Sequence, residues 1–224
     1  MSFIIAIDGP AGSGKGTVTK LLAQKLNFLT MDTGAMYRCV TLYLLRNNVN
    51  IENEELVKEK LNEIEIDLKE INNIQNFFLN GENVSKEIRE KCVDDLVSQV
   101  SHVPCVRTAM VELQRKLADG KNIVMEGRDI GTNVFPNANV KIYLDATAEE
   151  RARRRFEQNK QNGISNISYD EILENVKFRD NNDKTSSIAP LKKADDAIVI
   201  DSTNMKIDEV VEKIENLVVS AQSK

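Results

Sequence analysis

The chain has 224 residues, 41% of them hydrophobic and 29% charged, which predicts a folded domain with a packed core and excludes global disorder. Thirty basic against thirty-five acidic side chains give a net charge of −5, whereas proteins that mainly grip nucleic acid phosphates are usually basic. Three cysteines and one histidine are too few for a disulfide framework or a typical zinc site.

The first apolar run, residues 3–7, ends at Asp8 and is too short for a signal-peptide core or a membrane span. It is typical of a buried strand, and apolar residues at helical spacing then predict a helix over 15–26. A short strand over 28–31 and a helix over 35–45 follow. We expect a soluble, cytoplasmic chain with no membrane partner.

The middle of the chain changes pattern. Residues 63–68 alternate with period two, and 75–79 form a second strand pattern before the turn signal Asn80-Gly81. These features predict a small antiparallel sheet inserted in the fold.

Strand patterns return at 122–125, 140–144 and 197–200, and a helix is expected over 207–219. Strands alternating with helices predict an α/β fold with a parallel sheet covered on both faces. Between the last two of these strands we expect a helix over 148–158, a polar loop over 159–166, and a helix that opens with a capping box from Ser168 to Glu171.

A glycine-rich loop lies between the first strand and the first helix. Glycines let backbone N–H groups surround phosphate oxygens, and the helix N-terminus adds positive potential. A lysine in this loop reaches the β- and γ-phosphates of ATP. The loop predicts an ATP phosphate site made of Gly9, Pro10, Ala11, Gly12, Ser13, Gly14, Lys15, Gly16 and Thr17.

Gly16 stands directly after the lysine, where many phosphate loops have a serine or threonine, and Thr17 follows one place later. The sequence therefore leaves open whether a hydroxyl contacts Mg²⁺ directly. Water and the phosphates can hold most of the metal's shell, and we assign no protein residue as a metal ligand.

Two further segments suit an anionic acceptor. Thr33 and the amides after it begin a helix that can hold a phosphate, with Arg38 as a bidentate partner. Residues 125–132 start at the carboxyl end of a predicted strand, where ligands bind in open α/β sheets. There Arg128 can clamp a phosphate, and Asp129 can accept a hydrogen bond from an amino group.

Arg151, Arg154 and Arg155 share one face of a predicted helix. A solvated surface is the ordinary explanation for such a cluster. Beside a phosphate loop and a polar loop, the cluster favours a lid that closes over the transferring phosphates and excludes water.

In this order, the motifs resemble the bacterial cytidylate kinase family of nucleoside monophosphate kinases over nearly the whole chain. The phosphate loop alone would be unspecific. The resemblance rests on residues 7–17, 32–38, 84–89, 98–100, 106–107, 127–132, 134–136, 141–146, 149–151, 179–180, 189–191 and 200–203.

The resemblance implies a P-loop three-layer α/β/α fold with a five-stranded parallel sheet, an inserted antiparallel sheet and a helical lid. It implies one kinase domain over 1–224, with a core of 1–36, 98–150 and 187–224, a monophosphate-binding region of 37–97 and a lid of 151–186. We expect the protein to be a monomer that binds ATP and CMP or dCMP and no nucleic acid.

The resemblance also implies transfer of the γ-phosphoryl group of ATP, with Mg²⁺, to CMP or dCMP. Lys15, Arg128, Arg151 and Arg155 are the expected catalytic residues. Ser98 and Asp129 can accept hydrogen bonds from the amino group of cytosine, whereas uracil has a carbonyl at that position. The expected CMP-binding residues are Thr33, Tyr37, Arg38, Ser98, Arg107, Arg128, Asp129, Arg179 and Asp183.

One position departs from the family pattern. Ser186 stands where the family usually has an arginine, and serine supplies neither a charge nor a guanidinium fork. We expect weaker monophosphate binding than the intact pattern would give.

Other classes of protein share the phosphate loop. A switch GTPase needs Asn-Lys-x-Asp, but the candidate at 159–162 ends in an amide. A DNA-remodelling ATPase conflicts with the acidic balance. A binding module with an inactive loop is disfavoured because Lys15, Arg38 and Arg128 are present. A kinase acting on UMP, AMP or shikimate is the nearest alternative.

Overall fold

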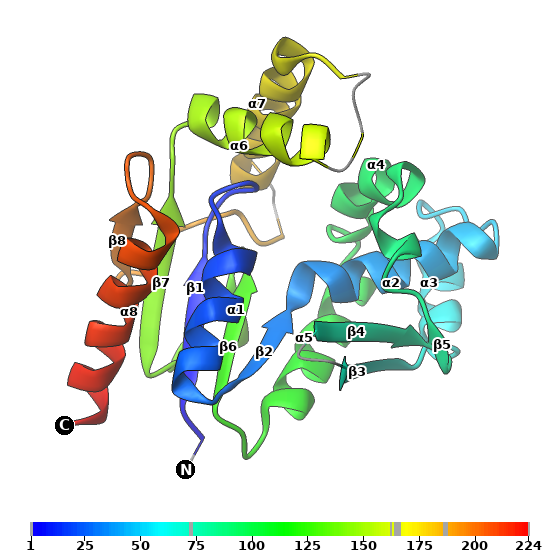
Figure 1. Ribbon diagram of the computed structural model, residues 1–224. Coiled ribbons are helices and arrows are strands. Elements are labelled where there is room, and N and C mark those ends of the chain that lie inside the picture. Colours follow the sequence, from blue (N-terminus) through cyan, green and yellow to red (C-terminus); the bar gives the residue numbers. More distant parts are fainter. Residues whose placement is uncertain (1, 72–73, 162, 164–166, 186–187, 224) are drawn as a thin grey trace. The chain divides into compact units, whose positions relative to one another are not determined.

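A computed structural model describes residues 2–71, 74–161, 163, 167–185 and 188–223 (Figure 1). The chain divides into two compact units. The core unit consists of Met1–Met31 and Gly120–Lys224, and the inserted unit of Asp32–Asp119. The expected single kinase domain with its three regions stays a prediction.

The core unit is built on the expected five-stranded parallel sheet, in the order β2-β6-β1-β7-β8. Parallel pairing aligns Ile5 with both Val124 and Val140. Short apolar runs form these strands because both faces of a parallel sheet are covered. The strands are β1 (Ile4–Asp8), β2 (Leu29–Asp32), β6 (Ile123–Gly127), β7 (Val140–Asp145) and β8 (Ile198–Asp201).

Helices α1 (Lys15–Leu26) and α8 (Ile207–Gln222) cover one face of this sheet (Figure 1). Ile5 and Ile7 of β1 pack against both helices in a buried cluster. Because side chains alternate along a strand, Asp8 lies on the opposite face. There it meets a short π-helix, η2 (Ile130–Val134), which follows β6.

Helices α6 (Ala148–Gln161) and α7 (Tyr169–Thr185) pack together around Ala152, Ile172 and Val176. The capping box at the start of α7 is confirmed, because the Ser168 N–H donates to the Glu171 carboxylate at 2.8 Å. Helix α6 continues to residue 161, so the prediction of a polar loop is wrong for residues 159–161. The rest of that loop, apart from Gly163, lies outside the described residues.

The inserted unit contains the expected antiparallel sheet, with strand order β3-β4-β5. Its first strand begins at Ile66 and not at residue 63, because the Asn80 side chain binds the Glu63 carbonyl at 2.9 Å and the Glu65 N–H at 2.7 Å. These strands are β3 (Ile66–Ile71), β4 (Ile74–Leu79) and β5 (Glu82–Asn83).

Helices make up the rest of the inserted unit. They are α2 (Thr33–Arg46), α3 (Glu54–Leu61), α4 (Lys91–Val100), α5 (Pro104–Ala118) and the 3-10 turn η1 (Glu87–Arg89). Across all described residues of both units, no helix is long and apolar enough to cross a membrane.

Candidate active site

The phosphate loop runs from the end of β1 to the start of α1, in the strand–loop–helix order that the sequence predicts. Gly9 has a φ of +153°, and a Cβ there would lie 2.0 Å from the Leu144 carbonyl oxygen. Neither backbone can accept such an overlap. Glycine is therefore required at this position for β1 to turn into the loop beside β7.

The Lys15 side chain is 5% exposed and folds back into the loop, where its amine donates to the Pro10 carbonyl at 2.7 Å. Burial, reinforced by the Arg128 guanidinium and opposed by Glu126, lowers the pKa of this amine from 10.5 to about 7. Without an anion, the loop thus disfavours the charged form of its own lysine. A bound phosphate would reverse that preference.

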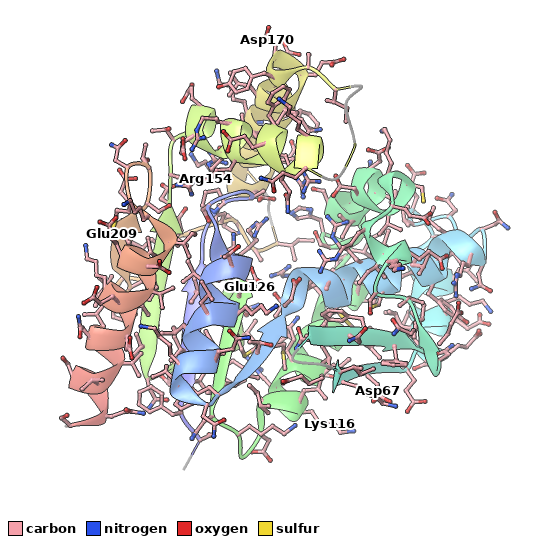
Figure 2. All side chains as sticks on the ribbon, viewed as in Figure 1. Asp67, Lys116, Glu126, Arg154, Asp170 and Glu209 are labelled. Atoms are coloured by element: carbon pink, nitrogen blue, oxygen red, sulfur yellow. The ribbon has the colours of Figure 1, made fainter. Side chains whose placement is uncertain are left out.

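Glu126 lies beside the first turn of α1 (Figure 2). A Cβ at Gly16 would come within 3.1 Å of a Glu126 carboxylate oxygen, so the glycine makes room for this carboxylate. Glu126 was not among the predicted site residues. The signal for it is its place one residue before the end of β6, where ligands bind in α/β sheets.

Arg128 and Asp129 follow β6 directly. The Arg128 Nε donates to an Asp183 carboxylate oxygen on α7 at 2.9 Å. Asp129 is 6% exposed and accepts a hydrogen bond from the Asn133 amide at 3.0 Å. Three of the residues predicted to bind the acceptor are thus gathered in the core unit, and Arg179 on α7 is half-buried.

Arg151 fastens α6 to the phosphate loop. This residue is 3% exposed, and its guanidinium donates to the Ala11 carbonyl at 3.1 Å and to both carboxylate oxygens of Asp180 at 2.8 and 2.5 Å. The fork geometry of the guanidinium allows these bonds to form together. The predicted catalytic arginine Arg151 is therefore bonded to protein groups here.

Arg154 makes a second connection of this kind (Figure 2). Its guanidinium donates to the Ser13 carbonyl at 3.3 Å and to the Ser202 carbonyl, after β8, at 2.6 Å. By contrast, Arg155 is exposed and donates to Gln158 of its own helix at 3.3 Å. The three arginines at helical spacing thus have different surroundings.

In the inserted unit, Asp32 caps the start of α2, where its carboxylate accepts the Ala35 N–H at 2.9 Å. Thr33 is buried at this helix start. One turn later, the Arg38 guanidinium forms a short ion pair with Asp94 of α4 and donates to the Ile88 carbonyl at 3.2 Å. A predicted phosphate-binding arginine is thus held between a carboxylate and a carbonyl.

Tyr37, Arg107 and Ser98 also belong to the inserted unit. The Arg107 guanidinium lies 5.7 Å from the centre of the Tyr37 ring and donates to the Ser101 carbonyl at 3.3 Å. Ser98 is half-buried on α4, and its carbonyl contacts His102 Nδ1 at 2.6 Å.

Four carboxylates near the predicted residues were not themselves predicted as site residues. They are Asp8, Glu126 and Asp180 in the core unit and Asp94 in the inserted unit. Sequence reasoning missed them because a lone carboxylate resembles any surface charge until its partner is known. Among the described residues, no cluster of three or more histidine, cysteine or acidic side chains is arranged to hold a metal ion.

Comparisons with known proteins give a consistent result. The family model described as Cytidylate kinase matches residues 5–220. A cytidylate kinase of Fusobacterium nucleatum is 50% identical over 210 residues, covering 94% of this chain and 94% of the relative. One of Caldicellulosiruptor bescii is 49% identical over 210 residues, covering 94% and 92%.

A solved structure of an uncharacterized protein from Eubacterium ventriosum matches with a TM-score of 0.52 at 16% identity. The match covers 98% of this chain and 99% of that one. This likeness concerns the fold alone.

Proposed function

The chain belongs to the cytidylate kinase family, and from this premise we propose how its residues act when it transfers the γ-phosphoryl group of ATP to CMP or dCMP. The observation that carries the proposal is the arrangement of the core unit. Strand β1 leads into the phosphate loop, and its neighbour β6 leads into Arg128 and Asp129. Both candidate binding elements therefore leave the sheet at its carboxyl edge.

The decisive experiment is a coupled ADP-release assay with CMP, dCMP, UMP, AMP and GMP as acceptors. Turnover with CMP and dCMP well above that with the other nucleotides is the expected result. ADP release that is independent of the acceptor would instead indicate an ATPase, and a preference for AMP or UMP would identify another monophosphate kinase.

In this mechanism an oxygen of the CMP phosphate attacks the γ-phosphorus of ATP while the bond from that phosphorus to the β–γ bridging oxygen breaks and ADP leaves, so the protein needs no covalent nucleophile. The residues Gly9 to Thr17 bind the ATP phosphates, and Lys15 neutralises charge at the β- and γ-phosphates. Arg128 holds the acceptor phosphate. The protein contributes position and positive charge, which are the main terms in phosphoryl transfer.

The lid arginines are proposed to divide their work. Arg151 holds the phosphate loop through the Ala11 carbonyl, and this bond supports the geometry of the backbone N–H groups that bind the ATP phosphates. Arg155 is exposed and can turn toward the transferring phosphoryl at the cost of its bond to Gln158. Arg155 then adds charge complementary to the transition state, while Arg151, which is paired with Asp180, contributes by holding the loop.

We propose CMP-binding residues within each unit, taken separately. In the inserted unit these residues are Thr33, Tyr37, Arg38, Ser98 and Arg107. In the core unit, Arg128 and Arg179 bind the phosphate, Asp129 binds the base and Asp183 binds the ribose. A carboxylate at Asp129 accepts from the cytosine amino group, which uracil lacks.

Mg²⁺ fits the donors at the start of α1, which are hard oxygen ligands. Thr17 has an exposed hydroxyl there, and the Glu126 carboxylate lies beside Gly16. These two residues would hold the ion together with phosphate oxygens and water. When bound, Mg²⁺ neutralises charge on the β- and γ-phosphates.

Asp94 is expected to weaken CMP binding, because the acceptor phosphate must compete with its carboxylate for Arg38. In Asp94→Asn, the KM for CMP should fall by about two- to fivefold, the range of a partly exposed ion pair. Asp95→Asn is the matched control, since the neighbouring Asp95 is exposed and pairs with Lys91. A rise in KM for Asp94→Asn would show that Asp94 instead orients Arg38 for the phosphate.

ATP binding is expected to take up a proton at mildly alkaline pH. The free loop lowers the pKa of Lys15 to about 7, and the phosphates raise it again, so the amine gains a proton on binding. Calorimetry in buffers of different ionisation enthalpy should find more uptake at about pH 8.5 than at about pH 6. Proton uptake that does not depend on pH in this range would contradict the assignment of Lys15 as the group that is protonated when the ATP phosphates bind.

Ser186 lies outside the described residues, so the expectation of weaker monophosphate binding stays a prediction. Ser186→Arg should lower the KM for CMP at saturating ATP, because it restores the guanidinium fork. If Ser186→Arg has no effect and Lys184→Ala is also silent, this segment does not contact the acceptor.

We propose further that the enzyme works as a cytoplasmic monomer and needs no nucleic acid or membrane partner. The net charge of −5 supports the absence of a nucleic acid partner. The core unit is proposed to carry ATP binding and the lid, and the inserted unit to carry part of the CMP site. Light scattering during turnover would test the oligomeric state.

A further inference from the structure

Asp8 is a buried carboxylate at the junction of β1 and the phosphate loop. It is 6% exposed, and it directly precedes Gly9. One carboxylate oxygen accepts the Ile130 N–H at 2.8 Å, and the other accepts the Gly131 N–H at 2.7 Å. Both of its oxygens are thus committed to the backbone of a segment more than a hundred residues away in the sequence.

The two N–H groups belong to the first residues of η2, which starts directly after Asp129. The first N–H groups of a helix have no acceptor within the helix, so they need one from elsewhere. Asp8 supplies it from the neighbouring strand. The Asp129 carbonyl in turn accepts the Asn133 N–H at 2.9 Å, so the peptide group that follows Asp129 is hydrogen-bonded through both its C=O and its N–H.

The packing around this carboxylate is tight. A Cβ at Gly131 would lie 3.3 Å from an Asp8 oxygen and 3.2 Å from the Lys141 side chain. Burial, with a smaller contribution from the Asp129 carboxylate, raises the pKa of Asp8 to about 6 against the lowering effects of the two N–H groups and of Lys15. Burying a carboxylate is costly, and here its two hydrogen bonds to the start of η2 offset that cost.

We propose that Asp8 is a positioning residue for base selection, which holds the backbone of Asp129 in a fixed relation to the phosphate loop. The inference rests on the proposed function, because it takes Asp129 as the residue that reads cytosine. In this arrangement the residue that opens the ATP loop also sets the place of the base-reading carboxylate. The known reaction then depends on Asp8 without direct contact between Asp8 and either nucleotide.

Asp8→Asn tests this role, because the amide keeps the shape but turns a donor toward one of the two N–H groups. The ratio of kcat/KM for CMP to that for UMP should fall by about tenfold, the loss of roughly one hydrogen bond to a charged group. The KM for CMP should rise more than the KM for ATP. A merely structural role would instead lower both activities in parallel and leave the CMP/UMP ratio unchanged.

Asp145→Asn is the matched control, since Asp145 also ends a strand of this sheet and its carboxylate accepts the Ala146 N–H at 2.8 Å. It should leave the CMP/UMP ratio as in the wild type. If Asp8→Asn does not fold, Gly131→Ala decides, because its methyl group presses on the same carboxylate from the η2 side. A wild-type ratio in that folded variant would overturn the proposal.

The two hypotheses fail in different ways. Wild-type enzyme that does not prefer CMP over UMP would contradict the proposed function. Wild-type enzyme with that preference, together with an Asp8→Asn enzyme that retains it, would contradict only the role of Asp8.

Discussion

Replacing Lys15 with methionine is expected to lower kcat for CMP phosphorylation by about a hundred- to a thousandfold. This is the usual effect of removing one group that stabilises the charge of a transition state. The lysine begins α1, and its amine lies within the phosphate loop, bonded to the Pro10 carbonyl. Methionine retains most of the side-chain volume and loses the charge. Steady-state kinetics at saturating ATP and CMP measures the effect.

Lys20→Met is the control for this substitution, because Lys20 is an exposed lysine on the same helix and should leave kcat unchanged. Near-wild-type transfer by Lys15→Met would show that the loop does not hold the transferring phosphates.

The same variant should be more stable than the wild type without nucleotide. The pKa of Lys15 is lowered from 10.5 to about 7 in the fold, so the charged amine opposes folding at and below neutral pH. This penalty fades as the pH rises from 7 toward 10.5, because the unfolded chain then also loses the proton. The difference in melting temperature between Lys15→Met and the wild type should therefore shrink over that range.

Replacing Asp129 with alanine is expected to lower kcat/KM for CMP by about 1–3 kcal/mol, typical of losing a hydrogen bond to a charged partner. Activity with UMP should fall much less, since uracil offers a carbonyl at the same place. The ratio of kcat/KM for CMP to kcat/KM for UMP should therefore fall. The buried position of Asp129, 6% exposed, keeps water from replacing the lost acceptor at full strength.

Asp129→Asn provides a second comparison, because its amide can donate to the uracil carbonyl. This variant should favour UMP more than the alanine variant does. An unchanged CMP/UMP ratio in both variants would remove Asp129 from the base pocket, even if overall activity fell.

Several elements could be predicted because their signals are local. The capping box from Ser168 to Glu171 and the turn at Asn80-Gly81 need only neighbouring residues. Strand β5 has two residues, too few to show any periodicity. Helix α4 is not among the predicted elements, although Val93, Val97 and Val100 have helical spacing and are buried.

The candidate site was predictable in part. Residues of the phosphate loop, Arg128 and Asp129 are recognisable because their chemistry requires residue types in a fixed order beside a strand. The pairing of arginines with carboxylates was not recognisable, although Asp183 itself was among the predicted residues. Arg38 pairs with Asp94 and Arg128 with Asp183, at separations of 56 and 55 residues, and no pattern along the chain marks such pairs.

The sequence by itself determined the class of fold, the phosphate loop and the family of this kinase, since each depends on short motifs in order. Only the tertiary structure decided what the arginines of α6 contact. Helical spacing puts Arg151 and Arg155 near one face, but one is buried against the Ala11 carbonyl, 140 residues away, and the other is exposed. The reason is physical: periodicity fixes the direction of a side chain, whereas packing of distant segments fixes its partner.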